Sequence, residues 1–147
     1  MYNRMESILF CKISVFYERY VRLSVLKGRH KRKDVMHLFE GKRILVTGGT
    51  GSFGNAFVRR LLDNYEFERL IVYSRDEFKQ YTMKNELIRE YGEEKIQKLR
   101  FFIGDVRDRE RMQRAAFAVN YIVHAAAMKH VPICEYNPFE AIKTNIH

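Results

Sequence analysis

A glycine-rich segment offers the clearest chemistry in this sequence. Residues 47–54 read Thr-Gly-Gly-Thr-Gly-Ser-Phe-Gly and fit two spacings: GxxGxxG through Gly48, Gly51 and Gly54, or GxGxxG with Gly49 as the first glycine. The first glycine permits a sharp turn, Gly51 lets backbone approach a pyrophosphate, and Gly54 permits close packing of a helix on a strand. Since the N-terminus of a helix attracts anions, the segment predicts a dinucleotide phosphate site. The alternative is a glycine turn without a ligand.

The residues that would select the cofactor follow the next apolar run. NAD-binding proteins usually place an acid at this point, where it binds the ribose 2′-hydroxyl. Here Ser74 can donate a hydrogen bond, and Arg75 can pair with a 2′-phosphate through its planar guanidinium. With Lys79 one helical turn later, this pattern favours NADP over NAD. Asp76 has two interpretations, as the acid that binds ribose or as the N-cap of a helix.

Three further positions fit the same site less specifically. Asp105 can accept a hydrogen bond from an adenine amino group, or it is a loop acid. Ala125 begins a run of three alanines that leaves room beside a cofactor, or simply packs. Lys129 lies just past an apolar run, where parallel sheets bind ligands, or it is a solvated loop lysine. His124 is interpreted as a packed or hydrogen-bonded core residue.

The elements that must position these residues alternate between strands and helices. Strands are predicted at 44–47, 70–73, 99–103 and 121–125, and helices at 52–65, 76–91, 108–119 and from 139 onward. Strands that are apolar on both faces and alternate with helices indicate a parallel sheet covered on both sides. With right-handed crossovers, the fold class is α/β, a partial Rossmann fold with strand order 3-2-1-4.

The positive charge is concentrated at the start of the chain. The 147 residues carry a net charge of +9, and two thirds of this excess lies in residues 1–35. Apolar residues at three- and four-residue spacing predict one amphipathic helix over 8–26. The segment is interpreted as a basic extension or linker, with a membrane-surface or partner helix as the alternative. Nucleic-acid binding is disfavoured because no recognition module accompanies the charge.

Cysteine usage and hydropathy limit the remaining classes. Cys11 and Cys134 are far apart, and the sequence has neither a CxxC pair nor a Cys/His metal spacing. We therefore expect no metal site, and free thiols in a reducing compartment, the cytoplasm. No run approaches the ~18 uncharged apolar residues of a membrane span, so no transmembrane segment is expected. The domains are then a basic amphipathic extension at 1–35 and a truncated NAD(P)-binding Rossmann domain at 36–147.

Four consecutive segments show a family resemblance. From about residue 39 onward the sequence resembles the extended short-chain dehydrogenases/reductases, and within them the inverting UDP-N-acetylglucosamine 4,6-dehydratases of polysaccharide biosynthesis, of the type found in the pseudaminic acid pathway. The resemblance lies in ILVTGGTGSFGNAFVRRLL (44–62), IVYSRDEFKQYTMKNEL (71–87), LRFFIGDVRDRERM (99–112) and IVHAAAMKHVPICEYNPFEAIKTNI (122–146).

The resemblance implies a role for each matching position. It places the NADP pyrophosphate on Thr50, Gly51, Ser52 and Phe53. It surrounds the adenosine ribose and its 2′-phosphate with Ser74, Arg75, Asp76, Glu77, Phe78 and Lys79. Adenine would contact Asp105 and Val106, and the nicotinamide side would be lined by Ala125 and Lys129. Lys129 would also reach the sugar nucleotide, and Asn145 would help to order the active site.

The resemblance also implies a reaction that this chain is not expected to complete. In the family, a UDP-sugar loses water in a redox-neutral sequence that recycles NADP, and inverting members also epimerise C5. The catalytic Asp-Lys pair and the Tyr-x-x-x-Lys helix are expected downstream of His147, so no catalytic residue is assigned here. A UDP-sugar substrate and a homo-oligomer are expected for the full-length enzyme. The alternatives are another sugar-nucleotide epimerase or dehydratase of the superfamily, or a non-catalytic NADP-binding or interaction module.

Overall fold

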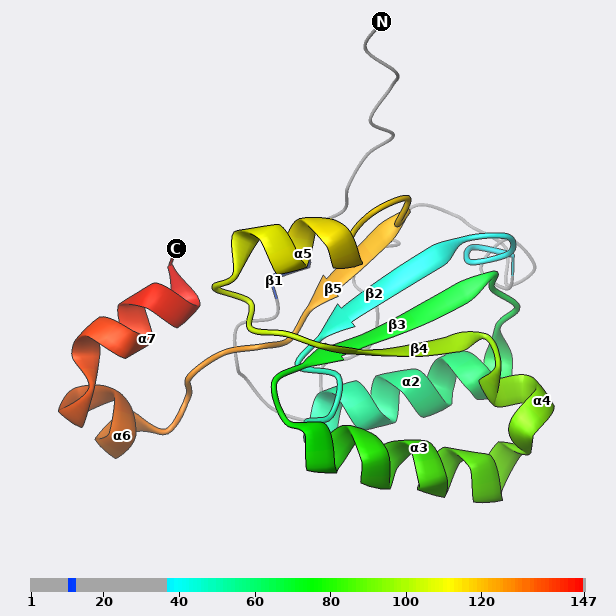
Figure 1. Ribbon diagram of the computed structural model, residues 1–147, viewed down its shortest axis with the longest axis horizontal. Coiled ribbons are helices and arrows are strands. Elements are labelled where there is room, and N and C mark those ends of the chain that lie inside the picture. Colours follow the sequence, from blue (N-terminus) through cyan, green and yellow to red (C-terminus); the bar gives the residue numbers. More distant parts are fainter. Residues whose placement is uncertain (1–10, 13–36, 147) are drawn as a thin grey trace, which may run out of the picture.

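The protein is built on a parallel β-sheet. The structure, a computed structural model, describes residues 11–12 and 37–146. Five strands lie in the order β1-β5-β2-β3-β4 (Figure 1). The four longer strands are β2 (Arg43–Thr47), β3 (Arg69–Ser74), β4 (Leu99–Ile103) and β5 (Tyr121–His124). All neighbouring strands are parallel, and these four reproduce the predicted 3-2-1-4 order.

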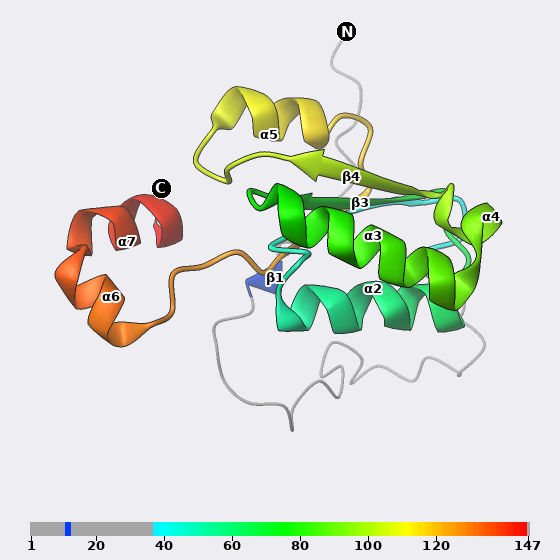
Figure 2. The same ribbon diagram turned by 60° about the horizontal axis from the view of Figure 1, so that its bottom comes forward.

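Helices cover the sheet on both sides. The helices α2 (Ser52–Asn64) and α3 (Glu77–Tyr91) lie side by side on one face, and α5 (Arg109–Ala115) lies on the other (Figure 2). The handedness of the crossovers explains this arrangement. The chain steps from β2 to β3 to β4 in one direction and returns from β4 to β5 in the other, so right-handed connections must use opposite faces.

Each face of the sheet has its own core. On the α2 and α3 side, Ile44 and Val46 of β2 pack with Val72 of β3 and with the helices. On the α5 side, Leu45 and Tyr73 belong to a smaller cluster around Ala115. Successive residues of one strand thus alternate between two apolar cores, which is why the strands read as continuous apolar runs.

The helix ends follow the predicted signals, with one exception. Asp76 caps α3 and Asp108 caps α5, each accepting a bond from a backbone N–H three residues on. Gly92 ends α3 with a φ of 79°, and a short helix that the sequence did not reveal, α4 (Glu93–Ile96), follows it. The prediction that α5 extends to residue 119 is wrong, because Ala118 adopts a φ of 57°, which a right-handed helix cannot include.

Two helices follow β5 and stand apart from the sheet (Figures 1 and 2). They are α6 (Val131–Tyr136) and α7 (Pro138–Asn145), and neither contains a buried residue. A single helix from 139 was predicted, and α6 was not. Pro132 lies in the first turn of α6, where a missing N–H leaves no hydrogen bond unmade.

A two-residue strand, β1 (Cys11–Lys12), pairs with β5 on its outer side. The apolar spacing predicted an amphipathic helix over these two residues, and this is wrong at these positions, where the structure has a strand. The rest of the predicted helix over 8–26 lies outside the described residues. Part of the edge of β5 is therefore paired, at Val123 and His124.

Candidate cofactor site

The turn after β2 is shaped by glycine. Gly48 has a φ of 64°, and a Cβ there would lie 2.8 Å from the carbonyl oxygen of Ala125. The N–H of Gly51 donates to the carbonyl of Gly48 at 2.9 Å and closes the turn. A Cβ on Gly49 would lie 2.7 Å from the Val72 side chain, so Gly49 serves packing against β3. Of the two glycine spacings, the one that begins at Gly48 therefore describes the turn.

The same turn leads directly into helix α2. A Cβ on Gly54 would lie 2.4 Å from the Cα of Gly49, so this first turn of α2 packs on the glycine turn itself. Gly51 is the N-cap, makes no side-chain capping bond, and no acidic residue lies in the first turn of α2. The start of α2 therefore has neither a capping side chain nor an acidic residue in its first turn, which suits an anion.

Three further residues of this segment, Thr50, Ser52 and Phe53, lie around the helix start. The Thr50 carbonyl accepts a bond from the Asn55 side chain at 3.1 Å, which ties the turn to α2. Ser52 is exposed as the first residue of the helix. Phe53 stacks on Phe57 with ring centroids 5.8 Å apart. Asn55 was not predicted as a site residue, although its position five residues after Thr50 allows this contact.

Thr47 joins the ends of β2 and β5. Its hydroxyl oxygen accepts from the N–H groups of Ala125 at 3.1 Å and Ala126 at 3.4 Å. With two N–H donors on that oxygen, the hydroxyl proton is directed to Nδ1 of His124, 2.7 Å away. His124 is thus a hydrogen-bonded strand residue, as predicted. The contact holds the backbone of Ala125 against the glycine turn.

The end of β3 is organised by a side chain that sequence analysis missed. Gln80 is buried, and its Nε2 donates to the Ser74 carbonyl, the Ser74 hydroxyl and the Phe102 carbonyl at 3.0–3.1 Å. Ser74 is itself 8% exposed and already accepts this bond. A polar residue at a helix position that faces the core was the available signal. Phe78, two residues earlier on the same helix, is 75% exposed.

The first turn of α3 decides between the two interpretations of Asp76. The N–H of Lys79 donates to the carboxylate of Asp76 at 2.9 Å, and this bond lowers the pKa of Asp76. Asp76 is therefore the N-cap. The ammonium of Lys79 lies 3.5 Å from the same carboxylate. Glu77 and Phe78 line a surface pocket beside Asp76.

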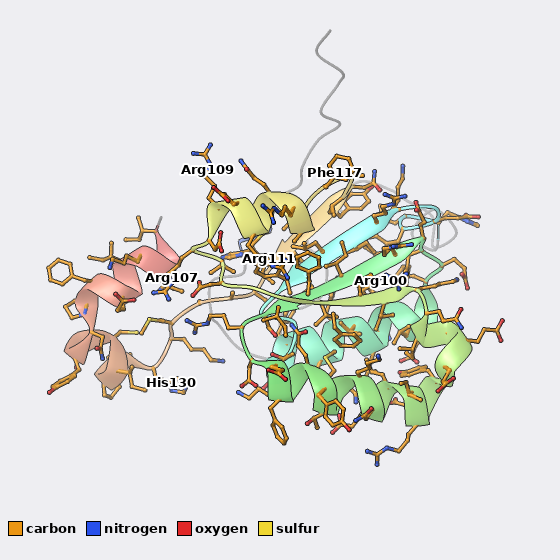
Figure 3. The ribbon with its side chains drawn as sticks, viewed as in Figure 1. Arg100, Arg107, Arg109, Arg111, Phe117 and His130 are labelled. Atoms are coloured by element: carbon orange, nitrogen blue, oxygen red, sulfur yellow. The ribbon has the colours of Figure 1, made fainter. Side chains whose placement is uncertain are left out.

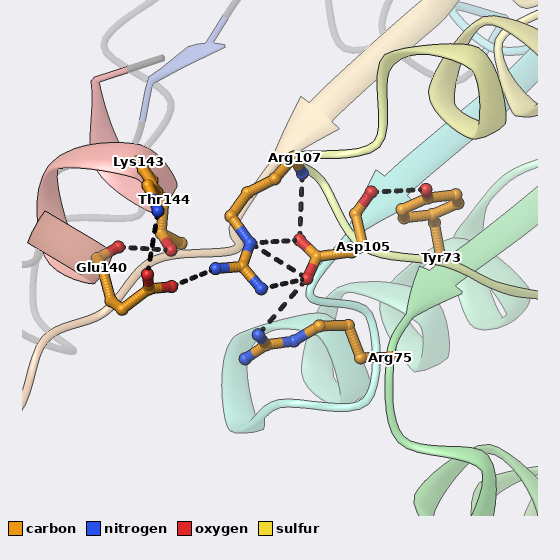
Figure 4. Close-up of polar contacts among 7 residues, drawn as sticks. All are labelled: Tyr73, Arg75, Asp105, Arg107, Glu140, Lys143 and Thr144. Atoms are coloured by element: carbon orange, nitrogen blue, oxygen red, sulfur yellow. Dashed lines mark hydrogen bonds and ion pairs between the residues drawn. The ribbon is translucent and has the colours of Figure 1, made fainter.

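Asp105 lies between two arginines (Figure 4). The Arg107 guanidinium contacts both carboxylate oxygens at 2.7–3.1 Å, and the Arg107 backbone N–H donates to one of them at 2.9 Å. Arg75 reaches the carboxylate more distantly, at 3.5 Å. These contacts, the bond from Arg107 above all, lower the pKa of Asp105. The hydroxyl of Tyr73 fixes the same loop by donating to the Asp105 carbonyl at 2.8 Å.

Helix α7 contacts this loop and the segment after β5. Arg107 also pairs with Glu140 of α7, and Figure 3 shows its side chain between the sheet and this helix. The Asn145 amide accepts from the Met128 N–H at 2.9 Å and donates to the Met128 carbonyl at 3.0 Å. Asn145 thus clamps the backbone next to Lys129, which is exposed. Arg107 and Glu140 were not singled out in the sequence.

The structure therefore gathers most of the proposed cofactor residues at one edge. The glycine turn, residues 74–79, residues 105–106 and Ala125 directly follow the carboxyl ends of β2, β3, β4 and β5, where open α/β sheets bind ligands. Val106 is half-buried there, against the core on the α5 side. Lys129 and Asn145 lie farther along, on the segment leading to α6 and α7. Residues 37–146 contain no metal-binding group of His, Cys, Asp and Glu, and no helix in this part of the chain could span a membrane.

Comparison with known proteins matches this fold and site to one family. The sequence profile of the family described as "Polysaccharide biosynthesis protein" matches residues 44–147. The chain belongs to this family. The resemblance seen in the four sequence segments is thereby confirmed at the level of the family.

Members of related enzyme classes align over the same part of the chain. The inverting UDP-N-acetylglucosamine 4,6-dehydratase of Campylobacter jejuni is 53% identical over 110 residues, covering 75% of this chain and 31% of that protein. A UDP-glucose 4-epimerase of Rickettsia rickettsii is 44% identical over 112 residues, covering 74% and 31%. The chain thus spans about a third of the length of these relatives.

A solved structure confirms the fold. DesIV, a dTDP-glucose 4,6-dehydratase from Streptomyces venezuelae with NAD and TYD bound, is 30% identical with a TM-score of 0.59. The alignment covers 71% of this chain and 32% of that one. The partial Rossmann fold predicted from the sequence is therefore correct.

Proposed function

We propose that this member of the polysaccharide biosynthesis family binds NADP at the carboxyl edge of its sheet, as the cofactor-binding part of a UDP-N-acetylglucosamine 4,6-dehydratase. The turn at Gly48 is the observation that supports this most directly. Its positive φ and its close approach to Ala125 leave bare backbone at the start of an uncapped helix. A pyrophosphate needs such a surface, because it is bound by backbone N–H groups and tolerates no side chain between.

Each end of the dinucleotide then has its own residues. Thr50, Gly51, Ser52 and Phe53 bind the pyrophosphate at the start of α2. Arg75, which is 62% exposed, offers its guanidinium to the 2′-phosphate, and this favours NADP over NAD. Asp105 and Val106 bind adenine. Ser74 and Asp76 contribute mainly by shaping the loop, because both already make the intramolecular bonds described above.

The reaction proposed for the sugar substrate rests on sequence identity to two classes of enzyme. Identity is higher to the 4,6-dehydratase of Campylobacter jejuni, at 53%, than to the epimerase of Rickettsia rickettsii, at 44%. We therefore favour dehydration of a UDP-sugar, with epimerisation as the second candidate. When bound, the nicotinamide supplies a hydride acceptor. Ala125 leaves room for that ring, Asn145 holds the adjacent backbone, and Lys129 is free to reach the sugar nucleotide. A cytoplasmic homo-oligomeric enzyme completes the proposal and rests on the resemblance alone.

Nucleotide binding by the 147-residue chain tests the proposal. We expect NADP to raise the thermal midpoint and to bind more tightly than NAD in calorimetric titrations, because a ligand of the folded state stabilises it. Arg75→Gln is expected to remove the preference for NADP while leaving NAD binding unchanged. Arg60→Gln, an exposed arginine on α2, is the control and should change neither affinity. An unchanged thermal midpoint at millimolar NADP would contradict the proposal.

A further inference from the structure

Asp105 makes unequal contacts with its two arginines. Arg107 approaches through its backbone N–H and two guanidinium nitrogens, with distances between 2.7 and 3.1 Å. Arg75 has one contact with the same carboxylate, at 3.5 Å. The Asp105 side chain is 24% exposed and that of Arg75 is 62% exposed. The carboxylate is therefore satisfied chiefly by Arg107, and the guanidinium of Arg75 remains largely in solvent.

We infer that Arg107 is a positioning residue that sets the cofactor preference by keeping Arg75 available for a 2′-phosphate. This inference rests on the proposed function, in which Arg75 binds that phosphate. Asp105 and the phosphate are both anions that can pair with the Arg75 guanidinium. If the Asp105 carboxylate is already paired with another cation, it competes less strongly with the phosphate for Arg75. Arg107, two residues after Asp105 in the sequence, is this other cation.

Helix α7 holds Arg107 in place from the other side. The third guanidinium nitrogen of Arg107, Nη1, pairs with Glu140, and Glu140 is itself paired with Lys143 at 3.2 Å. The charges thus alternate from Arg75 through Asp105, Arg107 and Glu140 to Lys143 (Figure 4). Arg107 pairs with Asp105 and with Glu140 at the same time, through different guanidinium nitrogens. The ion pair with Glu140 therefore does not compete with the ion pair to Asp105. Both guanidinium groups contact the same oxygen of Asp105, Oδ2, with Arg107 at 2.7 Å and Arg75 at 3.5 Å, so Arg107 holds the closer place on that oxygen.

Loss of Arg107 should therefore affect NADP and NAD differently. In Arg107→Gln the Asp105 carboxylate loses its close partner and draws in Arg75. NADP must then compete with Asp105 for Arg75, whereas NAD has no 2′-phosphate and uses no such contact. We expect the Kd for NADP to rise about fivefold, near the upper value of a partly exposed ion pair, and the Kd for NAD to change by less than about twofold.

A double-mutant cycle on the 147-residue chain separates this effect from a general loss of positive charge. Kd values for NADP and NAD are measured for the parent chain, Arg107→Gln, Arg75→Gln and the double variant. We expect Arg107→Gln to lower the NADP preference only while Arg75 is present. Arg109→Gln, which removes one charge from the adjacent helix α5, is the matched control and should leave the preference unchanged. Unfolding of each variant without nucleotide confirms that it is folded.

The other outcomes overturn the inference in distinguishable ways. If Arg107→Gln weakens NADP and NAD equally, Arg107 only stabilises the loop, and the proposed function stands without the inference. If it lowers the NADP preference equally in the Arg75→Gln background, the effect is long-range charge and the inference is wrong. If the parent chain binds neither nucleotide, both the proposed function and the inference fail.

Discussion

The backbones of Gly48 and Ala125 lie so close together that there is no room for a Cβ atom on Gly48. They follow β2 and β5, which are 77 residues apart in the sequence and neighbours in the sheet. A Cβ on Gly48 would lie 2.8 Å from the Ala125 carbonyl oxygen and 2.9 Å from the Ala126 nitrogen. The contact brings the glycine turn and the alanine run to the same point, where the dinucleotide is proposed to cross the edge of the sheet.

Replacing Gly48 with alanine should therefore cost more than the backbone strain alone. Gly41 has nearly the same φ, 65°, with no atom within 4 Å of its would-be Cβ, and is the matched control. We expect Gly41→Ala to lower the free energy of unfolding by about 1 kcal/mol from φ strain. Gly48→Ala should lower it by more than about 2 kcal/mol and abolish nucleotide binding, because backbone must move. Urea unfolding and nucleotide titration measure both, and equal losses of stability would contradict the close approach.

Gln80 should be one of the most sensitive polar residues in the chain. Gln80→Leu would remove the Nε2 donor that three acceptors share at the ends of β3 and β4, of which the Ser74 carbonyl also accepts from the Gly104 N–H at 3.0 Å. We expect a loss of about 2–3 kcal/mol in the free energy of unfolding, because unsatisfied buried acceptors carry their full desolvation cost. Gln113→Leu, on the exposed side of α5, should change stability by less than about 0.5 kcal/mol. If Gln80→Leu is as mild as that control, the three bonds do not form in solution.

Local patterns in the sequence predicted the sheet and its glycine turn, but not the polar contacts between segments. The glycine spacing and the apolar runs located the turn after β2 because both depend on short-range geometry. Gln80 reaches Phe102 across 22 residues, and Arg107 reaches Glu140 across 33. Such pairs depend on which loops the crossovers bring together.

Asp105 should make stability depend on pH in the acid range. Arg107 lowers its pKa in the folded state, so its contribution to stability is present above the unfolded pKa of about 3.9 and is lost as pH falls through the lower folded value. We expect Asp105→Asn to be about 1 kcal/mol less stable than the parent at pH 7, with the difference closing below about pH 3. Urea unfolding between pH 2 and about pH 7 measures this. Glu110→Gln changes the same charge on exposed α5 and is the control. A difference that stays constant with pH would contradict the ion pair.

Asn145 should control the mobility of the backbone at Met128. Its amide both accepts from and donates to that one residue, at 2.9 and 3.0 Å, and so links α7 to the segment after β5. Asn145→Ala removes both bonds, and we expect hydrogen exchange of the Met128 amide to become about five- to tenfold faster. Asn145→Asp keeps the acceptor, so the Met128 N–H should stay protected while the bond to its carbonyl is lost. Asn64→Ala, whose side chain bonds only to the Arg60 carbonyl one turn earlier, is the control and should leave Met128 unchanged. Exchange at Met128 that is equal in all four proteins would show that the clamp does not hold this segment.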